Sequence, residues 1–541
     1  MDVALALKLI PTAIAATLLW SLARRYVFKH PLDILPGPPA LSLITGKSRL
    51  CATFLERCYG RVTRTYGLFK CAVQERVLYV SDPKAFSHIF LKEQHIYEES
   101  DPFLVSNNAI FGKGLLSTLG NQHKRQRKML NPVFSVSHMR KMVPTFFKVT
   151  YDLRDVLLQK TAKGPQEIEM VSWLTRTALE IVALCGLGRS FSPVTGDGEE
   201  HKFISSIKLL GPLGRGLILV RQLVLPILVK YKIGTGSMLK SIGLMLPWPT
   251  LHKMIDVVDT MHEVSLDIFH SKKKDLEQNK DADDDERKRD FLSILMRENA
   301  KAEEADRLPD DEVIAQISTL MFAAMDTTSS ALSRIIWLLA KHQDVQETLR
   351  AEIREAKERF GEPDYDELAA LPYLDAVCKE SLRMYPPAPF LSRQARQDAV
   401  LPFSKPVKTV DGKEIKEIFV PKDTMLTISI HALNTDPEIW GPDAFEWKPE
   451  RWLSQLPKSV FDAHVPGVFS HMMTFIGGGR ACIGFKFSEM EMKVILYVLV
   501  DLFKFKLGKQ EILWNIQGLT TPCVDRKELR PKLPVVVSRA I

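Results

Sequence analysis

Residues 475–484 read Phe-Ile-Gly-Gly-Gly-Arg-Ala-Cys-Ile-Gly, and this stretch decides the fold. Its glycines let the backbone wrap closely around the sulfur of Cys482 and direct N–H groups at it. The apolar run after it, residues 485–499, predicts a buried helix, whose N-terminal dipole lowers the pKa of a preceding thiol. Phe475 can cover the sulfur, and Arg480 can offer a fixed cation to a carboxylate. These features predict that Cys482 ligates a metal ion as a thiolate.

A buried free cysteine after a glycine-rich turn is the alternative interpretation of this stretch. Five positions, however, match the motif F-x-x-G-x-R-x-C-x-G. At average residue usage, a match anywhere in such a chain has a chance probability on the order of 10⁻⁴. The motif is the signature of the cytochrome P-450 family, which the sequence resembles from its N-terminus to its end. The resemblance implies heme b (iron protoporphyrin IX) as cofactor, Cys482 as the axial ligand of its iron, and Phe475 and Arg480 as heme-binding residues.

Further family landmarks follow in the expected order. Glu380 and Arg383 resemble the E-x-x-R of the family's K helix, and residues 385–387 (Tyr-Pro-Pro) end that helix directly afterwards. Other pairs in the chain share this spacing but lack that context, so we interpret them as ordinary surface pairs. Arg451, in a P-E-R-W segment, would complete a buried Glu–Arg–Arg network with a structural role. Arg393 lies where the family places an arginine that binds a heme propionate.

A long apolar helix is predicted from about residue 312 to residue 342, and it carries Ala323-Ala324-Met325-Asp326-Thr327-Thr328. This segment resembles the family's A/G-G-x-D/E-T-T/S, with alanine at 324 where glycine is more usual. Dioxygen activation requires protons at the distal oxygen, so Asp326 and Thr327 are predicted to be the catalytic proton-relay pair. The alternative is an acid and a hydroxyl tolerated in a packed helix, which the hydroxyl bends by back-bonding.

The basic segment at residues 120–128 resembles the family's C helix. Its usual W-x-x-x-R appears as His123 and Arg127, one helical turn apart, so that both could reach the same heme propionate. Most of the basic run is expected to be a solvated face, suited to docking an acidic flavoprotein. The form of this segment resembles the fungal microsomal branch of the family.

The N-terminal segment predicts a membrane anchor. Residues 3–22 contain a single charged residue, Lys8, and about 20 apolar residues span a bilayer as a helix. Arg24, Arg25 and Lys29 follow and predict that this flank stays cytoplasmic. In a cleaved signal peptide, the competing interpretation, the positive charges would precede the apolar run. We therefore expect an anchor at 1–23, a proline-rich hinge at 24–45 and a catalytic domain at 46–541.

Composition narrows the class of protein. The 541 residues carry a net charge of +8, without a basic stripe interleaved with aromatics, so no nucleic acid partner is expected. The seven cysteines are scattered and show no C-x-x-C pair, which favours a thiol-reducing, cytosol-facing domain. We expect a hairpin at about 61–83, strands at 399–421 around a turn at Asp411-Gly412, and a polar loop at 277–290. The expected fold is mainly α with a minor β portion, the cytochrome P-450 fold, as one catalytic domain plus one N-terminal transmembrane helix.

The resemblance also implies the reaction and its partners. The expected enzyme is a monooxygenase in the endoplasmic reticulum membrane, single-pass, with its catalytic domain on the cytoplasmic side. It would take electrons from NADPH through NADPH–cytochrome P-450 reductase, with cytochrome b5 as a further candidate partner. The resemblance implies that the apolar residues 217–231 form a roof over the substrate channel that dips into the membrane, which favours a lipophilic substrate; the pattern alone fits a core helix equally well.

The substrate expected from the fungal-type form is a terpenoid of secondary metabolism, with fatty acids, sterols and xenobiotics as alternatives. Three other functions compete with the monooxygenase. A heme-thiolate isomerase or dehydratase would need no reductase, and a heme sensor or carrier would need no proton relay. A silent membrane scaffold would need no cysteine motif.

Overall fold

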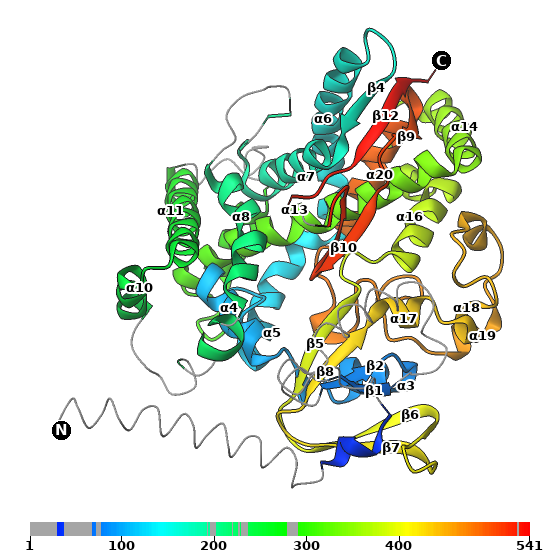
Figure 1. Ribbon diagram of the computed structural model, residues 1–541. Coiled ribbons are helices and arrows are strands. Elements are labelled where there is room, and N and C mark those ends of the chain that lie inside the picture. The colour runs from blue at the N-terminus through cyan, green and yellow to red at the C-terminus, as the bar shows by residue number, and fades with distance from the viewer. Residues whose placement is uncertain are drawn as a thin grey trace.

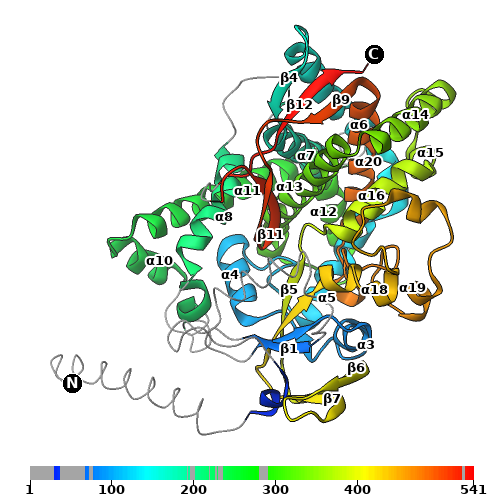
Figure 2. The same ribbon diagram turned by 45° about the vertical axis from the view of Figure 1, so that its right-hand side comes forward.

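The computed structural model of the chain describes residues 30–36, 68–71, 77–191, 193–194, 202–218, 220–225, 228, 236–278, 290–526 and 530–540. Helices fill most of the molecule in Figure 1, where β1, β2, β5, β8 and the β6–β7 hairpin lie at the lower end and β4, β9 and β12 lie among the helices at the top. The turned view in Figure 2 shows the same division between the helical part and the part that contains β1 and the β6–β7 hairpin. The mainly α fold with a minor β portion is thus confirmed.

The helical part is built on long helices that pack around a common core. These are α6 (Val136–Lys160), α7 (Met170–Leu187), α11 (Pro249–Gln278), α13 (Asp310–Lys341), α14 (Gln343–Phe360), α16 (Pro372–Met384) and α20 (Phe485–Leu502). The shorter helices are α3 (Pro83–Ser87), α4 (Asp101–Phe111), α5 (Gly120–Leu130), α8 (Lys202–Gly216), α10 (Gly236–Met245), α12 (Phe291–Lys301), α15 (Tyr365–Ala369), α17 (Ile430–Asn434), α18 (Pro437–Trp440) and α19 (Lys458–Asp462). Single turns of other helix types are η1 (Pro31–Ile34), η2 (His88–Lys92), η3 (Asn131–Phe134), η4 (Val220–Val224), η6 (Pro449–Leu453) and η7 (Gly478–Arg480).

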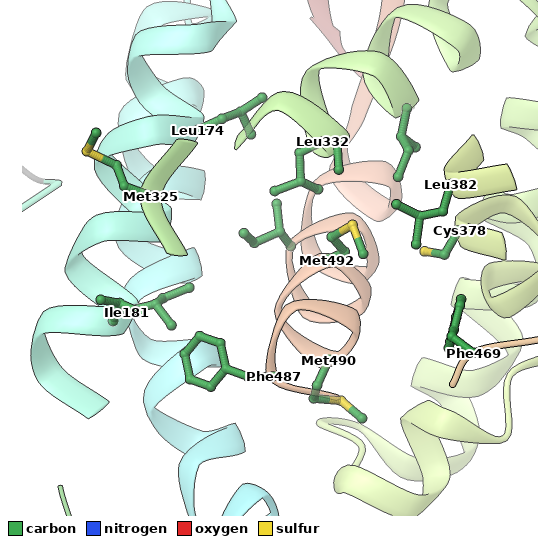
Figure 3. Packing of buried hydrophobic residues seen from close by; sticks show 14 of the residues in the cluster. Leu174, Ile181, Met325, Leu332, Cys378, Leu382, Phe469, Phe487, Met490 and Met492 are labelled. Carbon is green, nitrogen blue, oxygen red and sulfur yellow. The ribbon is translucent and has the colours of Figure 1, made fainter. Parts of the chain in front are cut away.

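The core surrounds α20, which is mostly apolar and whose residues 490–501 are all buried. Neighbouring helices α6, α13, α14 and α16 pack against it, and α13 packs in turn against α7. Figure 3 shows side chains from four of these helices in one cluster. The labelled ones are Leu174 and Ile181 of α7, Met325 and Leu332 of α13, Cys378 and Leu382 of α16, and Phe487, Met490 and Met492 of α20. Close packing fixes the start of α20, and with it the residues just before.

The strands form four small sheets, of which the largest has the order β1-β2-β8-β5-β3. Its members are β1 (Leu68–Cys71), β2 (Val77–Val80), β3 (Tyr97–Glu98), β5 (Phe390–Ala395) and β8 (Met425–Ser429). The other strands are β4 (Gln166–Glu169), β6 (Ala399–Lys408), β7 (Glu414–Val420), β9 (Phe503–Leu507), β10 (Leu513–Gln517), β11 (Leu519–Cys523) and β12 (Pro534–Arg539). In the largest sheet β5 lies between β3 and β8, and its antiparallel pairing with β8 sets Arg393 opposite Leu426.

Several expectations from the sequence are confirmed. The early hairpin is β1 paired with β2, and the later strands are β6 and β7, joined at a turn where Gly412 has φ of +81°. The helix expected from 312 to 342 is α13, and the helix after the cysteine is α20. The expected polar loop follows the end of α11 at Gln278 and lies mostly outside the described residues.

The anchor expected at 1–23 lies outside the described residues, as does most of the hinge at 24–45. In the part of the chain that is described, one helix, α7, is long and apolar enough to cross a membrane. However, 72% of that helix is buried inside the protein. Its apolar character is therefore accounted for by its place in the core.

Candidate active site

Cys482 lies in a tight loop between η7 and α20. Its N–H donates a hydrogen bond to the carbonyl of Phe475 at 2.9 Å, which closes the loop. Gly478 has φ of +70°, and a Cβ there would lie 1.9 Å from the carbonyl oxygen of Phe90 in η2. No side chain fits at that approach, so the glycine is required to seat the loop against η2.

The side chain of Cys482 faces an internal cavity. The sulfur lies deep in the protein, yet it is accessible because the cysteine forms part of the cavity wall. The cavity lies between helices α7, α12, α13 and α20, measures about 870 Å³ together with its opening to solvent, and has a mostly apolar wall. The lining residues from α13 include Ala323, Ala324 and Thr327, so the cysteine and the predicted catalytic threonine line the same cavity. Phe475 also lines it, packed edge-on against Phe469.

The pKa of the Cys482 thiol corrects one expectation from the sequence. Burial raises this pKa, although the N–H of Gly484 and the Arg127 guanidinium act to lower it. The expectation that the helix N-terminus lowers the pKa of Cys482 is therefore wrong for the protein alone, because desolvation of the thiolate raises this pKa by more than the helix lowers it. Coordination to a metal ion is what deprotonates a thiol in such a position.

Arg127 and Arg480 flank the cysteine loop. Arg127 Nη1 donates to the carbonyl of Ala481 at 2.6 Å, and Arg480 Nη2 donates to the carbonyl of Thr118 at 2.8 Å. The first bond ties α5 to the residue just before Cys482, and the second ties the loop to the segment just before α5. The structure thus places Arg127 and Arg480, two of the three predicted heme-binding arginines, at the cysteine loop.

Arg393 reaches the same region from strand β5. Its Nη2 lies 3.2 Å from Oε1 of Glu99, while Nε of Arg480 lies 3.1 Å from Oε2 of that carboxylate. The guanidinium of Arg393 also stacks over the ring of Phe90. Glu99 therefore joins two predicted heme-binding arginines that are far apart in the sequence.

His123 is buried on α5, one turn before Arg127. Burial lowers its pKa to about 3, with the charges of Arg480 and Arg127 adding to the effect. The imidazole is therefore neutral near pH 7. It can donate one hydrogen bond to an anion at this site but brings no charge to it.

Asp326 and Thr327 lie side by side in the middle of α13. Thr327 Oγ1 donates to the carbonyl of Ala323 at 2.8 Å, the back-bonded arrangement considered as the alternative interpretation. Burial raises the pKa of Asp326 to about 6, and the charge of Lys208 opposes the rise. A carboxyl group with this pKa exchanges protons readily near neutral pH.

The predicted Glu380–Arg383–Arg451 network is assembled away from the cavity. Arg451 Nε lies 3.3 Å from Glu380, and Trp452 Nε1 donates to the same carboxylate at 2.9 Å. Arg383 adds hydrogen bonds to the carbonyls of Asn434 and Ala444. The network therefore fastens α16 to the segment that leads toward the cysteine loop.

Sequence reasoning missed three polar residues of this region. Glu99 and Gln94 look like surface residues in the sequence, yet Gln94 Oε1 accepts the N–H of Gly479 at 2.7 Å. Glu491, on α20, is fully buried, and burial raises its pKa well above the usual range, against the effect of the Thr328 hydroxyl. In the sequence, only the position of Glu491 within an apolar run could have indicated that it is buried. No local pattern indicates a role for Glu99 or Gln94.

Comparisons with known proteins identify the family. The family model described as cytochrome P-450 matches residues 53–524. Cytochrome P-450 monooxygenase 91 of Postia placenta is 44% identical over 96% of this chain and 97% of its own. The ganoderic acid synthetase CYP5150L8 of Ganoderma lucidum is 38% identical, with 97% of each chain covered.

A crystal structure of a cytochrome P-450 (CYP102L1) superposes with a TM-score of 0.69 over 94% of this chain and 100% of that one, at 21% identity. This likeness supports the fold, and the fungal relatives support the reaction class. With a family model over most of its length and relatives at up to 44% identity, this chain belongs to the fungal members of the cytochrome P-450 family, which are heme b monooxygenases.

Proposed function

We propose that this monooxygenase hydroxylates a lipophilic small molecule of fungal secondary metabolism, using dioxygen and electrons from NADPH by way of cytochrome P-450 reductase. The observation that carries the proposal is the shared cavity. The Cys482 sulfur and the Ala323–Thr327 segment of α13 line the same mostly apolar space. A buried, accessible sulfur facing an apolar helix provides a ligand for iron and a dry place for a substrate.

The residues present fit a heme. Cys482 would bind the heme iron through its sulfur, Phe475 would cover that sulfur, and three arginines near the cysteine loop, together with neutral His123, would receive the propionates. Bound heme b supplies the iron at which dioxygen is activated. Arg127, Arg393 and Arg480 are always charged and offer forked donors, which suit a carboxylate.

Protons for the reaction would be handled by α13. The Thr327 hydroxyl lines the cavity. It can rotate away from the Ala323 carbonyl and donate a hydrogen bond into the cavity instead. Asp326, with a pKa of about 6, would pass protons to Thr327 from the side on which Lys208 lies.

The cavity wall favours an apolar substrate. Its side chains around the middle of α13 include Ile317, Leu320 and Met321, with Leu292 and Leu295 from α12. Such a surface binds the hydrocarbon groups of a substrate and offers it few polar contacts. A terpenoid is the class that we propose, ahead of fatty acids, sterols and xenobiotics, and the name of the ganoderic acid synthetase relative supports a fungal metabolite of this kind.

We further propose a single-pass protein of the endoplasmic reticulum membrane, with an anchor at 1–23, a hinge at 24–45 and the catalytic domain, 46–541, on the cytoplasmic side. An apolar patch around α10 supports contact with lipid. It consists of Met238, Ile242, Leu244, Met245 and Leu246, and Met245 is 83% exposed. A contiguous exposed patch of large apolar side chains is costly in water and typical of a membrane contact.

The test is the carbon monoxide difference spectrum of the reduced protein for wild type, Cys482→Ala and Cys378→Ala. Cys378 is buried in the core and serves as the matched control. We expect a strongly red-shifted Soret band in wild type and Cys378→Ala and its loss in Cys482→Ala. A histidine-type band in all three would refute the site. Turnover without NADPH and reductase would indicate the isomerase or dehydratase instead.

A further inference from the structure

Glu99 is a buried carboxylate shared by two cations. It is 8% exposed, with Arg393 Nη2 at 3.2 Å from one oxygen and Arg480 Nε at 3.1 Å from the other. The two arginine side chains are only 5% and 9% exposed. Removing one partner of such a buried ion pair is costly, because the other partner is left as an unpaired charge in the interior.

The position of Glu99 is fixed by its backbone. Strand β3 pairs with β5 just before it, with Glu98 opposite Gln394. Arg396 Nη2 donates to the carbonyl of Glu99, and the hydroxyls of Ser100 and Ser392 lie 3.2 Å apart. The same strand β5 carries Arg393, so the carboxylate and its first cation are held in register by one sheet.

The second cation comes from the cysteine loop, and it is crowded by positive charge. Arg480 contacts Glu99 at 3.1 Å, and Arg127 lies beside the same loop, where its Nη1 donates to the carbonyl of Ala481 at 2.6 Å. Three guanidiniums in a partly buried place repel one another. The two propionates of a heme would balance part of this charge, and Glu99 is the carboxylate in direct contact with both Arg393 and Arg480.

We propose that Glu99 is a positioning residue of the heme site, which holds Arg393 and Arg480 in place and balances their charge, and thereby keeps the reduction potential of the iron low. This inference rests on the proposed placement of the heme. An additional negative charge near the iron favours the ferric over the ferrous form, so removing it makes the potential more positive. Neither composition nor any family motif in the sequence singles out this glutamate.

The test is redox potentiometry on the purified, heme-loaded full chain. Glu99→Gln keeps the shape and removes the charge, Glu99→Asp keeps the charge, and Asp101→Asn is the matched control. Asp101 lies two residues away and pairs with Arg396 at 2.5 Å rather than with the two propionate arginines. We expect a more positive ferric/ferrous midpoint potential in Glu99→Gln, and values close to wild type in Glu99→Asp and Asp101→Asn.

The heme content and the midpoint potentials of the variants together test the role of Glu99. If Glu99→Gln fails to load heme while Glu99→Asp loads it, the requirement for charge is supported. An unchanged or more negative potential in Glu99→Gln would overturn the proposal, and so would an equal shift in Glu99→Asp or Asp101→Asn, or failure of both Glu99 variants to load heme. The carbon monoxide band of wild type is recorded on the same samples. Its absence would refute the heme site itself, whereas a normal band with an unshifted Glu99→Gln potential refutes only the role of Glu99.

Discussion

Glu380 and Arg383 form a bidentate ion pair, with both N–O contacts at 2.8 Å and both side chains completely buried. Arg451 adds a second cation at 3.3 Å from the same carboxylate. One buried anion thus serves two buried cations, and further carbonyls complete the donors of Arg383. The ion pair is compatible with a stable fold only when both residues are present, because either one alone would be an unpaired charge in the interior.

We predict that Glu380→Gln lowers the free energy of unfolding by about 3–5 kcal/mol, since it leaves the buried Arg383 without its carboxylate and Arg451 with Asp443 alone. Heme retention should fall in parallel, because the network fastens α16 near the cysteine loop. Denaturant unfolding checks the first effect and heme absorbance the second. The control is Glu298→Gln, which breaks a surface pair of the same sequence spacing with Lys301, at 3.8 Å. The control should cost at most about 1 kcal/mol, and equal losses in the two variants would contradict the prediction.

Gly478→Ala should prevent the cysteine loop from seating. Its Cβ would lie 1.9 Å from the Phe90 carbonyl, so the loop must move, and the positive φ adds about 1–2 kcal/mol of strain. We expect loss of most heme from the purified protein. Gly412→Ala is the control, because Gly412 also has positive φ but open space around it. If both variants retain heme equally, the close approach to η2 is not needed.

The pH dependence of the free energy of unfolding should reflect the titration of the Asp326 carboxyl group. Its folded-state pKa of about 6 lies above the usual value of 3.8, so folding favours the protonated form. The corresponding stabilisation is complete below about pH 4 and is lost as the pH rises through 6. Relative to Asp326→Asn, wild type should therefore lose at most about 3 kcal/mol of unfolding free energy across this window, and nothing further above it. Asp310→Asn, at the exposed start of α13, is the control, and parallel curves for wild type and Asp326→Asn would contradict the prediction.

Thr327→Ala should uncouple electron use from product formation. Without the hydroxyl, proton delivery loses its last group in the cavity wall, and general acid–base groups contribute about 10²–10⁴-fold to rates. We expect product per NADPH to fall severalfold or more, with substrate affinity by optical titration unchanged. Thr327→Ser keeps the hydroxyl and should remain close to wild type. Unchanged coupling in Thr327→Ala would leave Thr327 with only its bond to the Ala323 carbonyl.

Contact of the α10 patch with lipid can be measured through Trp248, which lies next to the patch and is half-buried. In full-length protein reconstituted into vesicles, brominated lipid should quench part of the tryptophan emission. The quenched component should shrink in Trp248→Phe to the part that comes from Trp20 in the proposed anchor, and it should be unchanged in Trp514→Phe, whose indole packs against Arg334. Identical quenching in the two variants would place the patch away from the bilayer.

The sequence predicted those parts of the site that depend on local spacing. The cysteine loop, the pair Glu380 and Arg383, and the helix carrying Asp326 all follow from residues a few positions apart. Glu99 could not be found in this way, since its partners Arg393 and Arg480 come from distant segments and meet it only through the sheet. The pKa of Cys482 was wrongly expected to be low, because a sequence shows the helix dipole but not how deeply the sulfur is buried.

The strand order β1-β2-β8-β5-β3 also has a consequence for synthesis on the ribosome. Strand β3 ends at residue 98, but its partner β5 is complete only at residue 395. At about 5–20 residues per second, roughly 15–60 s of translation separate the two strands. During that interval β2 has emerged without β8, and β3 has emerged without β5. The nascent chain therefore carries unpaired strand edges, which are open to pairing with other chains until the second half of the protein is made.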